Sequence, residues 1–212
     1  MIHSVLLSQL SWLAHGFGTR QDPKPPRETV FLKQIHSGIV HEVGPQTAAG
    51  CWGEGDGLIT NAPGKLLEIR TADCYPVLLA DRANHAAGAL HAGWRGAAAN
   101  IIAEALARMD QLYGTKPEEV YLSIGPGIGV CCYQVGEEVA RQFNADCCVR
   151  TNGTIHLNLA EANRKQALQA GIPPSHIETM NLCTFCQAQE FYSYRREKEQ
   201  AGRMLSWVEI TE

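Results

Sequence analysis

The chain has 212 residues, of which 45% are hydrophobic and 19% charged, and its formal net charge at pH 7 is −4. A chain of this length and composition can bury one sizeable core, and we expect a single domain over residues 1–212. The negative charge, without a long basic stretch, argues against a nucleic-acid partner. No apolar run reaches the length of a membrane span.

The N-terminal segment and the eight cysteines bear on the cellular compartment. Residues 1–17 are apolar, and the first arginine is Arg20, so a cleaved signal peptide is not expected. We therefore expect a cytoplasmic protein with reduced thiols, most of which pack as small hydrophobic side chains. Cys183 and Cys186 form a C-x-x-C pair, which is half of a zinc site or a redox pair. No second C-x-x-C completes an all-cysteine site.

The first half of the chain is expected to contain loops and short strands. Three prolines make residues 21–28 the most loop-like stretch, and glycines predict a second loop over 50–57. Between them, β-branched and apolar residues predict a strand over 29–43 that is broken at Ser37-Gly38. Further short strands are predicted over 65–71, 76–81 and 85–93.

The second half mixes helices with strands. Apolar residues at helical spacing predict a helix over 97–114 that stops at Gly114. Two more helices are predicted over 135–143 and 159–170, the second capped by Asn158. Strands are predicted over 119–124 and 203–210, and a hairpin over 149–157 with Asn152-Gly153 as a type I′ turn. Because strands outnumber helices without alternating with them, we expect an α+β fold of mixed sheets with helices packed outside.

Two soft, titratable side chains lie at the ends of neighbouring predicted strands. In TADCYPVLLADRANHAAGALHAGWRG (71–96), Cys74 precedes one apolar run and His91 ends the next, seventeen positions later. They are core residues, or a thiolate nucleophile with its base beside Asp73 and Arg95, or two ligands of a metal ion.

His36 ends the KQIH segment and supplies a third side chain of suitable type. Three Cys and His ligands on separate segments fit a catalytic zinc ion, which keeps its fourth position for water. A zinc-bound thiolate is not free to attack, so the metal hypothesis and the nucleophile hypothesis exclude each other. No local spacing links the three residues, and on spacing alone core packing is the commoner outcome.

Further binding groups follow glycine-rich segments. The turn in IGPGIGVCCY (124–133) is either a phosphate cradle or, by default, a structural turn, and Pro126 removes one of its N–H donors. Arg20 in HGFGTR and Arg95 in GWRG can each clamp a phosphate or carboxylate, and the alternative for each is an ordinary ion pair.

Taken in order, several segments resemble one family, the laccase-domain proteins (multicopper polyphenol oxidase or purine nucleoside phosphorylase family). They are HGFGTR, KQIHSGIV, GDGLIT, TADCYPVLLAD, HAGWRG, IGPGIGVCCYQVG and CTFCQAQEFYSYRRE…GRMLSW, and they cover the chain from about residue 15 to 207. Three departures stand out. The segment before KQIH is short, Gly127 stands where many relatives have cysteine, and Gln134 stands where they often have glutamate.

The resemblance implies a zinc-dependent enzyme that converts purine nucleosides and phosphate to the free base and ribose 1-phosphate. It also implies deamination of adenosine. The family pattern maps the metal ligands onto His36, Cys74 and His91. We expect Cys74 and His91 at the catalytic centre with Asp73, which is chosen for its adjacency. The expected substrate-binding residues are Arg20, Gln34 and Arg95.

Three alternatives to this activity remain. A copper-dependent polyphenol oxidase needs more converging histidines than can be placed here, so zinc is favoured over copper. A Cys-dependent hydrolase or amidase would use Cys74 as its nucleophile. A non-catalytic zinc domain would have a closed four-ligand site that recruits Cys183 or Cys186. The oligomeric state is left open.

Overall fold

The computed structural model describes residues 1–22, 25 and 27–212. The predicted loop over 21–28 therefore lies partly outside the described residues. Among the described residues, no helix is both long enough and apolar enough to span a bilayer.

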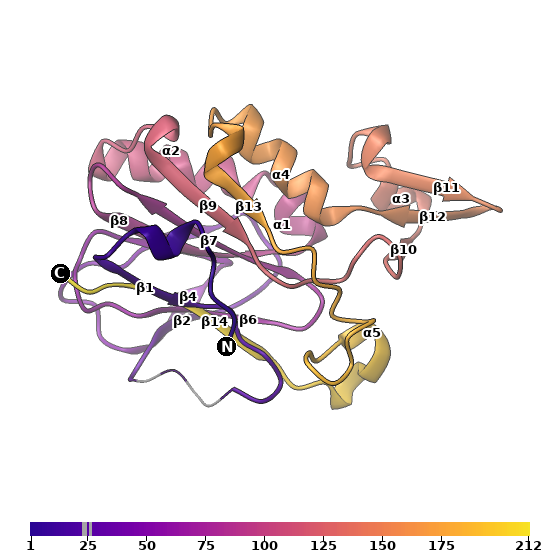
Figure 1. Cartoon of the computed structure of the whole chain (residues 1–212), viewed down its shortest axis with the longest axis horizontal. Helices are drawn as coiled ribbons and strands as arrows, with labels where there is room; N and C mark the ends of the chain where they lie inside the picture. Colours follow the sequence, from indigo (N-terminus) through magenta and orange to yellow (C-terminus); the bar gives the residue numbers. More distant parts are fainter. Residues whose placement is uncertain (23–24, 26) are drawn as a thin grey trace.

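Two mixed β-sheets stack against each other (Figure 1). The six-stranded sheet has the order β13-β9-β7-β8-β5-β3, and the five-stranded sheet has the order β1-β14-β6-β2-β4. The strands of the first are β3 (Val40–Glu42), β5 (Gly57–Thr60), β7 (Tyr75–Asp81), β8 (Ala86–Ala92), β9 (Val120–Ile124) and β13 (Ile177–Thr179). Those of the second are β1 (Leu13–Gly16), β2 (Val30–Lys33), β4 (Gly50–Glu54), β6 (Leu67–Thr71) and β14 (Met204–Ile210).

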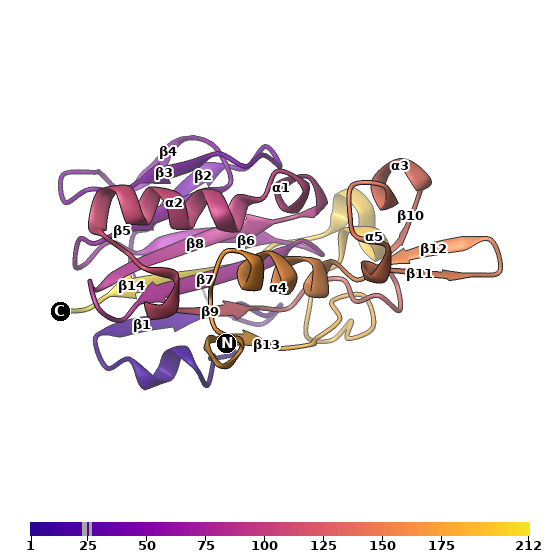
Figure 2. The same cartoon turned by 90° about the horizontal axis from the view of Figure 1, so that it is seen from above.

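Helices cover the outer face of the six-stranded sheet (Figure 2). They are α1 (Trp94–Ala98), α2 (Ile101–Tyr113) and α4 (Leu159–Gln169). Strand β7 shows why the sheet lies in the middle: Val77 and Leu79 pack with the helices, whereas Leu78 and Ala80 pack toward the five-stranded sheet. A strand that is apolar on both faces needs cover on both sides. The three layers confirm the predicted α+β fold with mixed sheets and helices outside.

A smaller unit projects from one end of these layers (Figures 1 and 2). It contains β10 (Gln134–Val135), β11 (Cys148–Thr151), β12 (Thr154–Leu157) and α3 (Glu137–Ala140). Helix α5 (Tyr194–Glu197) lies at the same end. Short 3₁₀ turns are formed by Leu7–Gln9, Pro117–Glu119, Ala145–Cys147, Pro174–His176 and Lys198–Gln200.

Local turn chemistry accounts for several confirmed predictions. Asn152 and Gly153 both have positive φ, +49° and +76°, and connect β11 directly to β12 as a type I′ hairpin turn requires. The Asn158 side chain accepts a hydrogen bond from the backbone N–H of Glu161 at 3.1 Å, which caps α4. Gly114 has φ +73° at the end of α2.

Three predictions differ from the structure, two of them in ways that the backbone explains. Residues 50–57 are not a loop, because 50–54 form β4, an edge strand parallel to β2. The predicted helix over 97–114 is two helices, because Asn100 adopts a left-handed conformation with φ +61° and separates α1 from α2. Helix α3 is also shorter than predicted and ends at Ala140.

Candidate metal centre and its pocket

His36, Cys74 and His91 meet at one end of the six-stranded sheet. Strands β7 and β8 are antiparallel, with Pro76 opposite His91, so the residue just before β7 lies near the end of β8. His36 lies between β2 and β3, which belong to different sheets, so this connection crosses from one sheet to the other. The candidate ligand atoms of the three residues all lie within 4.8 Å of one another. We call these three residues the His–Cys cluster.

Asp56 holds two members of the His–Cys cluster in place, and the sequence did not single it out as a site residue. It is fully buried and accepts a hydrogen bond from His91 Nδ1 at 2.7 Å, which leaves Nε2 as the nitrogen for a ligand. Asp56 also accepts the backbone N–H of Ile35, His36 and Ser37 at 3.2, 3.0 and 2.6 Å. One carboxylate thus positions both the His36 loop and the His91 ring.

The charges in the cluster favour a thiolate at Cys74. Burial alone would raise the pKa of this thiol, but the neighbouring His91 and His36 outweigh burial and lower the pKa to about 6. Burial would lower the pKa of His91, yet Cys74 and Asp56 raise it to about 9. Burial would raise the pKa of Asp56, but hydrogen bonds from His91 and Ser37 lower it to about 2. The thiolate is the form of cysteine that binds metal ions.

The backbone around the cluster is tightly packed and partly strained. A Cβ atom on Gly93 would lie 2.8 Å from Cys74 Sγ and 3.4 Å from His36 Cδ2. His36 and Asp73 have φ values of +59° and +91°, in the left-handed region that few such residues adopt. Strain of this kind is retained where the surrounding structure imposes it, commonly at functional sites.

The His–Cys cluster lines a pocket of about 490 Å³, a size typical of small-molecule sites. Most of the larger side chains that line it are arginines or aromatic residues. The arginines are Arg70, Arg95, Arg195 and Arg203, and the aromatic residues are Trp94, Tyr133 and Tyr194. Guanidinium groups bind phosphate, and aromatic faces stack on planar rings, so the lining suits a phosphate group together with a planar ring system.

Of the three predicted substrate-binding residues, two line the pocket and one does not. Arg95 and Gln34 line the pocket. The Gln34 amide forms two hydrogen bonds of 2.8 Å with the backbone of Arg70. Arg20 does not line the described pocket: its guanidinium pairs with Glu197 and lies 4.3 Å from the Tyr192 ring centroid.

Asp73 lies at the pocket with both carboxylate oxygens engaged. Oδ1 accepts from the Thr184 hydroxyl at 2.7 Å, and Oδ2 accepts from the backbone N–H of Arg195 at 2.6 Å. These bonds join the start of β7 to two segments near the C-terminus. The acid–base role of Asp73 stays a prediction.

The glycine-rich turn after β9 is structural. Four of its backbone N–H groups are already used: those of Gly125, Gly127, Ile128 and Gly129 donate to Pro76 O, Leu182 O, Asp73 O and Cys183 Sγ, respectively. A phosphate cradle needs free N–H groups, and because these four are engaged the structure favours the structural turn over the cradle. A Cβ on Gly127 would also lie 2.6 Å from the Tyr75 ring, which explains the glycine there.

Several pocket residues were missed by sequence reasoning. Arg195 and Arg203 lie near the C-terminus, and Tyr133 follows the cysteine pair in the β9–β10 connection. Both arginines lie within the last family motif, CTFCQAQEFYSYRRE…GRMLSW, but the motif gave neither of them a role. GDGLIT contained Asp56, but nothing in the sequence paired it with His91.

The fold and the pocket define an α+β protein with a pocket built against a cluster of two histidines and one cysteine. A family model described as multi-copper polyphenol oxidoreductase laccase matches residues 18–211, and the chain belongs to this family. The resemblance identified from the sequence motifs is thereby confirmed.

Two relatives are named purine nucleoside phosphorylase, the second of the two names used for this family. The purine nucleoside phosphorylase of Bacteroides thetaiotaomicron is 42% identical over 163 residues, which are 73% of this chain and 60% of that protein. The purine nucleoside phosphorylase of Deinococcus radiodurans is 43% identical over 184 residues, or 84% of this chain and 68% of that protein. The chain thus spans about 60% to 68% of the length of these two relatives.

Solved structures share the fold over nearly the whole chain. The Bacillus licheniformis hypothetical protein YfiH matches with a TM-score of 0.88 at 28% identity, over 96% of this chain and 94% of that one. YlmD from Geobacillus stearothermophilus matches with a TM-score of 0.84 at 27% identity, over 96% and 93% of the two chains.

Proposed function

We propose that this protein is a zinc-dependent purine nucleoside phosphorylase that also deaminates adenosine. The observation that carries the proposal is the His–Cys cluster on the wall of a pocket rich in arginine and aromatic side chains. Relatives named purine nucleoside phosphorylase, 42% and 43% identical, support the same assignment. The substrates are adenosine, inosine, guanosine or methylthioadenosine, together with phosphate.

The donor set of the cluster fits zinc. Two imidazoles and one thiolate are ligands that zinc prefers, and three protein ligands leave a position for a small molecule. A multicopper oxidase requires several copper centres with many histidines. Among the described residues, the other group suited to a metal consists of four cysteines. Zinc is therefore favoured over copper.

Each part of the pocket has a distinct task in this proposal. When bound by His36, Cys74 and His91, zinc supplies Lewis acidity and lowers the pKa of a bound water. The pocket arginines, with Arg95 among them, bind phosphate as bidentate donors. The aromatic residues hold the purine ring, and Gln34 fixes the pocket wall through the Arg70 backbone.

Acid–base chemistry is assigned to residues beside the cluster. Asp56 keeps the His91 ring oriented with Nε2 toward a ligand. Asp73 is the proposed proton carrier, and its bonds to Thr184 and Arg195 hold it at the pocket. Cys74 acts as a ligand and not as the attacking group, which separates this proposal from a Cys-dependent hydrolase.

The test is turnover by zinc-loaded protein. Adenosine and inosine are incubated with and without phosphate, and adenine, hypoxanthine, inosine and ribose 1-phosphate are followed by chromatography. We expect free base and ribose 1-phosphate only with phosphate, and inosine from adenosine with or without it. Cys51→Ser, which changes an exposed thiol outside the pocket, is the matched control.

Two results would overturn this proposal. The first is no turnover by protein whose His–Cys cluster holds zinc. The second is unchanged turnover in Cys74→Ala, because a metal ligand is not dispensable. The same series tests the two alternatives. A copper-loaded sample is incubated with a phenol to test for oxidase activity, and a metal-free sample is incubated with an amide to test for hydrolase activity.

A further inference from the structure

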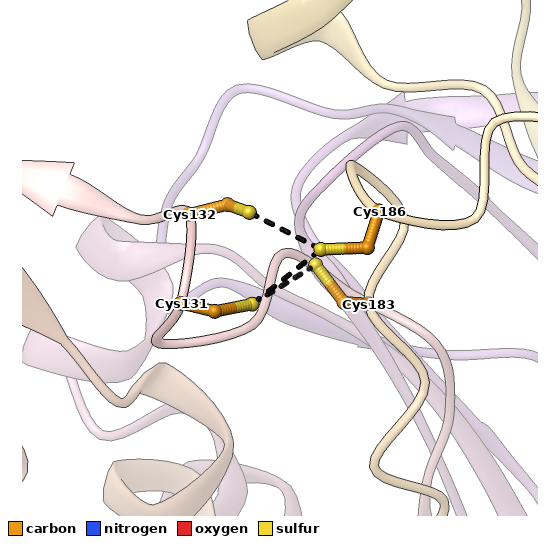
Figure 3. A group of neighbouring side chains, drawn as sticks. All are labelled: Cys131, Cys132, Cys183 and Cys186. Carbon is orange, nitrogen blue, oxygen red and sulfur yellow. Dashed lines mark hydrogen bonds between the residues drawn. The ribbon is translucent and has the colours of Figure 1, made fainter.

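Four cysteines outside the His–Cys cluster converge on one point (Figure 3). Cys131 and Cys132 come from the connection between β9 and β10, and Cys183 and Cys186 come from the segment after β13. Cys131 Sγ lies 3.7 Å from Cys183 Sγ and 3.6 Å from Cys186 Sγ, and Cys132 Sγ lies 3.3 Å from Cys186 Sγ. All four sulfurs lie within 4.8 Å of one another. We call these residues the four-cysteine cluster.

We propose that the four-cysteine cluster binds a structural zinc ion, separate from any metal in the pocket. Zinc–sulfur bonds are about 2.3 Å long, so the sulfurs of a tetrahedral site lie about 3.8 Å apart. Three of the sulfur–sulfur separations, 3.3 to 3.7 Å, are close to that value. A disulfide needs a separation of about 2.05 Å, and it would use only two of the four sulfurs.

The loops that carry the cluster are already joined by their backbones. Gly127 donates its N–H to Leu182 O at 3.2 Å, and Thr184 donates to Gly127 O at 3.0 Å. The backbone N–H of Gly129 donates to Cys183 Sγ at 3.2 Å, which orients that sulfur. Hydrogen bonds to ligand atoms are a regular feature of metal sites. Zinc would therefore bind with small shifts of the side chains.

The adjacent pair Cys131-Cys132 answers the question that the lone C-x-x-C raised. Sequence spacing offered no second C-x-x-C, yet two neighbouring cysteines from a distant loop supply the missing ligands. With four protein ligands the site is closed, and a closed site stabilises structure and does no chemistry of its own.

The proposed ion would tie together two walls of the pocket. Tyr133, which follows Cys132, lines the pocket, and Thr184, which follows Cys183, donates to Asp73. The Arg196 guanidinium donates to the carbonyl oxygens of Thr184 and Phe185 at 2.9 and 2.6 Å. Helix α5, which contains Arg196, is thereby held to the same loop. The inference does not depend on which reaction the pocket performs.

Metal stoichiometry tests the inference. Wild-type protein, purified with zinc and a reductant, is measured by elemental analysis and native mass spectrometry. We expect two zinc ions per chain, falling to one in Cys183→Ser/Cys186→Ser and to one in Cys74→Ser. Combining the three substitutions removes both ions, and Cys51→Ser retains both. The experiment counts zinc ions and does not measure turnover. Its result can therefore be interpreted even if the protein lacks the proposed activity.

Thiol labelling provides a second readout on the unaltered protein, in case the variants fail to fold. A maleimide probe followed by peptide mapping should label Cys51 but spare the four-cysteine cluster until a chelator is added. The inference is overturned if wild-type protein holds only one zinc ion and Cys74→Ser removes it. Peptides joined by a Cys132–Cys186 or Cys131–Cys183 disulfide in zinc-supplied, reduced protein would overturn it equally.

Discussion

The His–Cys cluster and the four-cysteine cluster both gather soft side chains from distant segments, but they differ in what surrounds them. His91 is only 3% exposed, its ring is bonded to a carboxylate that is fully buried, and the cluster lines a pocket. Both clusters contain exposed members, His36 in the first and Cys131 and Cys186 in the second, but the four-cysteine cluster is supported by the backbone N–H of Gly129 and not by a carboxylate. The first cluster borders a pocket with room for a small molecule, whereas in the second all four candidate metal ligands are protein sulfurs.

The supports of the two clusters differ as well. Cys74 and His91 lie at the ends of strands that are buried along their whole length, so the sheet positions them. The four cysteines lie in connections between strands, which have fewer restraints of their own. We therefore expect metal removal to abolish chemistry at the first cluster and to loosen structure at the second.

Cys74→Ala tests the chemical side of this comparison and has the largest expected effect. Loss of the thiolate removes the pocket metal, and we expect kcat/KM for inosine to fall by about 10³-fold or more. The melting temperature should change little, and the zinc of the four-cysteine cluster should remain. Steady-state kinetics and metal analysis check both statements. Wild-type kinetics in this variant would show that the cluster is not the catalytic centre.

Asp56→Asn tests whether the buried carboxylate supports the metal site. The amide keeps the size of the side chain but loses its charge, and we expect zinc affinity at the pocket to fall by about 10- to 100-fold. Competition with a chromophoric chelator measures it. Ser37→Ala is the matched control, because it removes one hydroxyl donor to Asp56 and leaves the bond to His91. Equal effects of the two substitutions would contradict a special role for the Asp56–His91 pair.

Cys183→Ser/Cys186→Ser tests the structural side. Without the second zinc ion the loops around the pocket lose a cross-link, and we expect about 2 kcal/mol less stability, a fall in melting temperature of about 4–8 °C. Activity should fall about tenfold, because Tyr133 and α5 are held less firmly, while the pocket retains its metal. Thermal unfolding with and without a chelator measures the loss. If the double variant is as stable as Cys51→Ser, the four-cysteine cluster has no structural role.

Gly93→Ala tests the packing around Cys74 Sγ and has the smallest expected effect of the four variants. The added Cβ would lie 2.8 Å from Cys74 Sγ, so the sulfur must shift, at a cost of about 1 kcal/mol. Zinc affinity at the pocket should fall roughly fivefold, with the four-cysteine cluster unaffected. Gly44→Ala is the control, since nothing lies within 4 Å of its Cβ position. If Gly93→Ala leaves zinc affinity at the pocket unchanged, metal binding does not depend on the exact position of Cys74 Sγ.

Much of the secondary structure was accessible from local sequence, because its causes are local. The Asn152-Gly153 turn, the Asn158 cap and the stop at Gly114 each depend on conformations that these residues adopt readily. Strand β4 was missed because its glycines imitate a loop, and pairing with β2 outweighs their weak strand preference. The break at Asn100 was missed because helical periodicity continues through it.

By itself, the sequence determined the fold class, the family and the choice of His36, Cys74 and His91 as candidate ligands. Only the tertiary structure decided how they are held, since Asp56 and His91 are 35 positions apart and meet through strand packing. It likewise placed Arg20 in an ion pair away from the pocket. The four-cysteine cluster joins residues more than 50 positions apart. No local pattern encodes such a contact, because long-range proximity arises only when the sheets assemble.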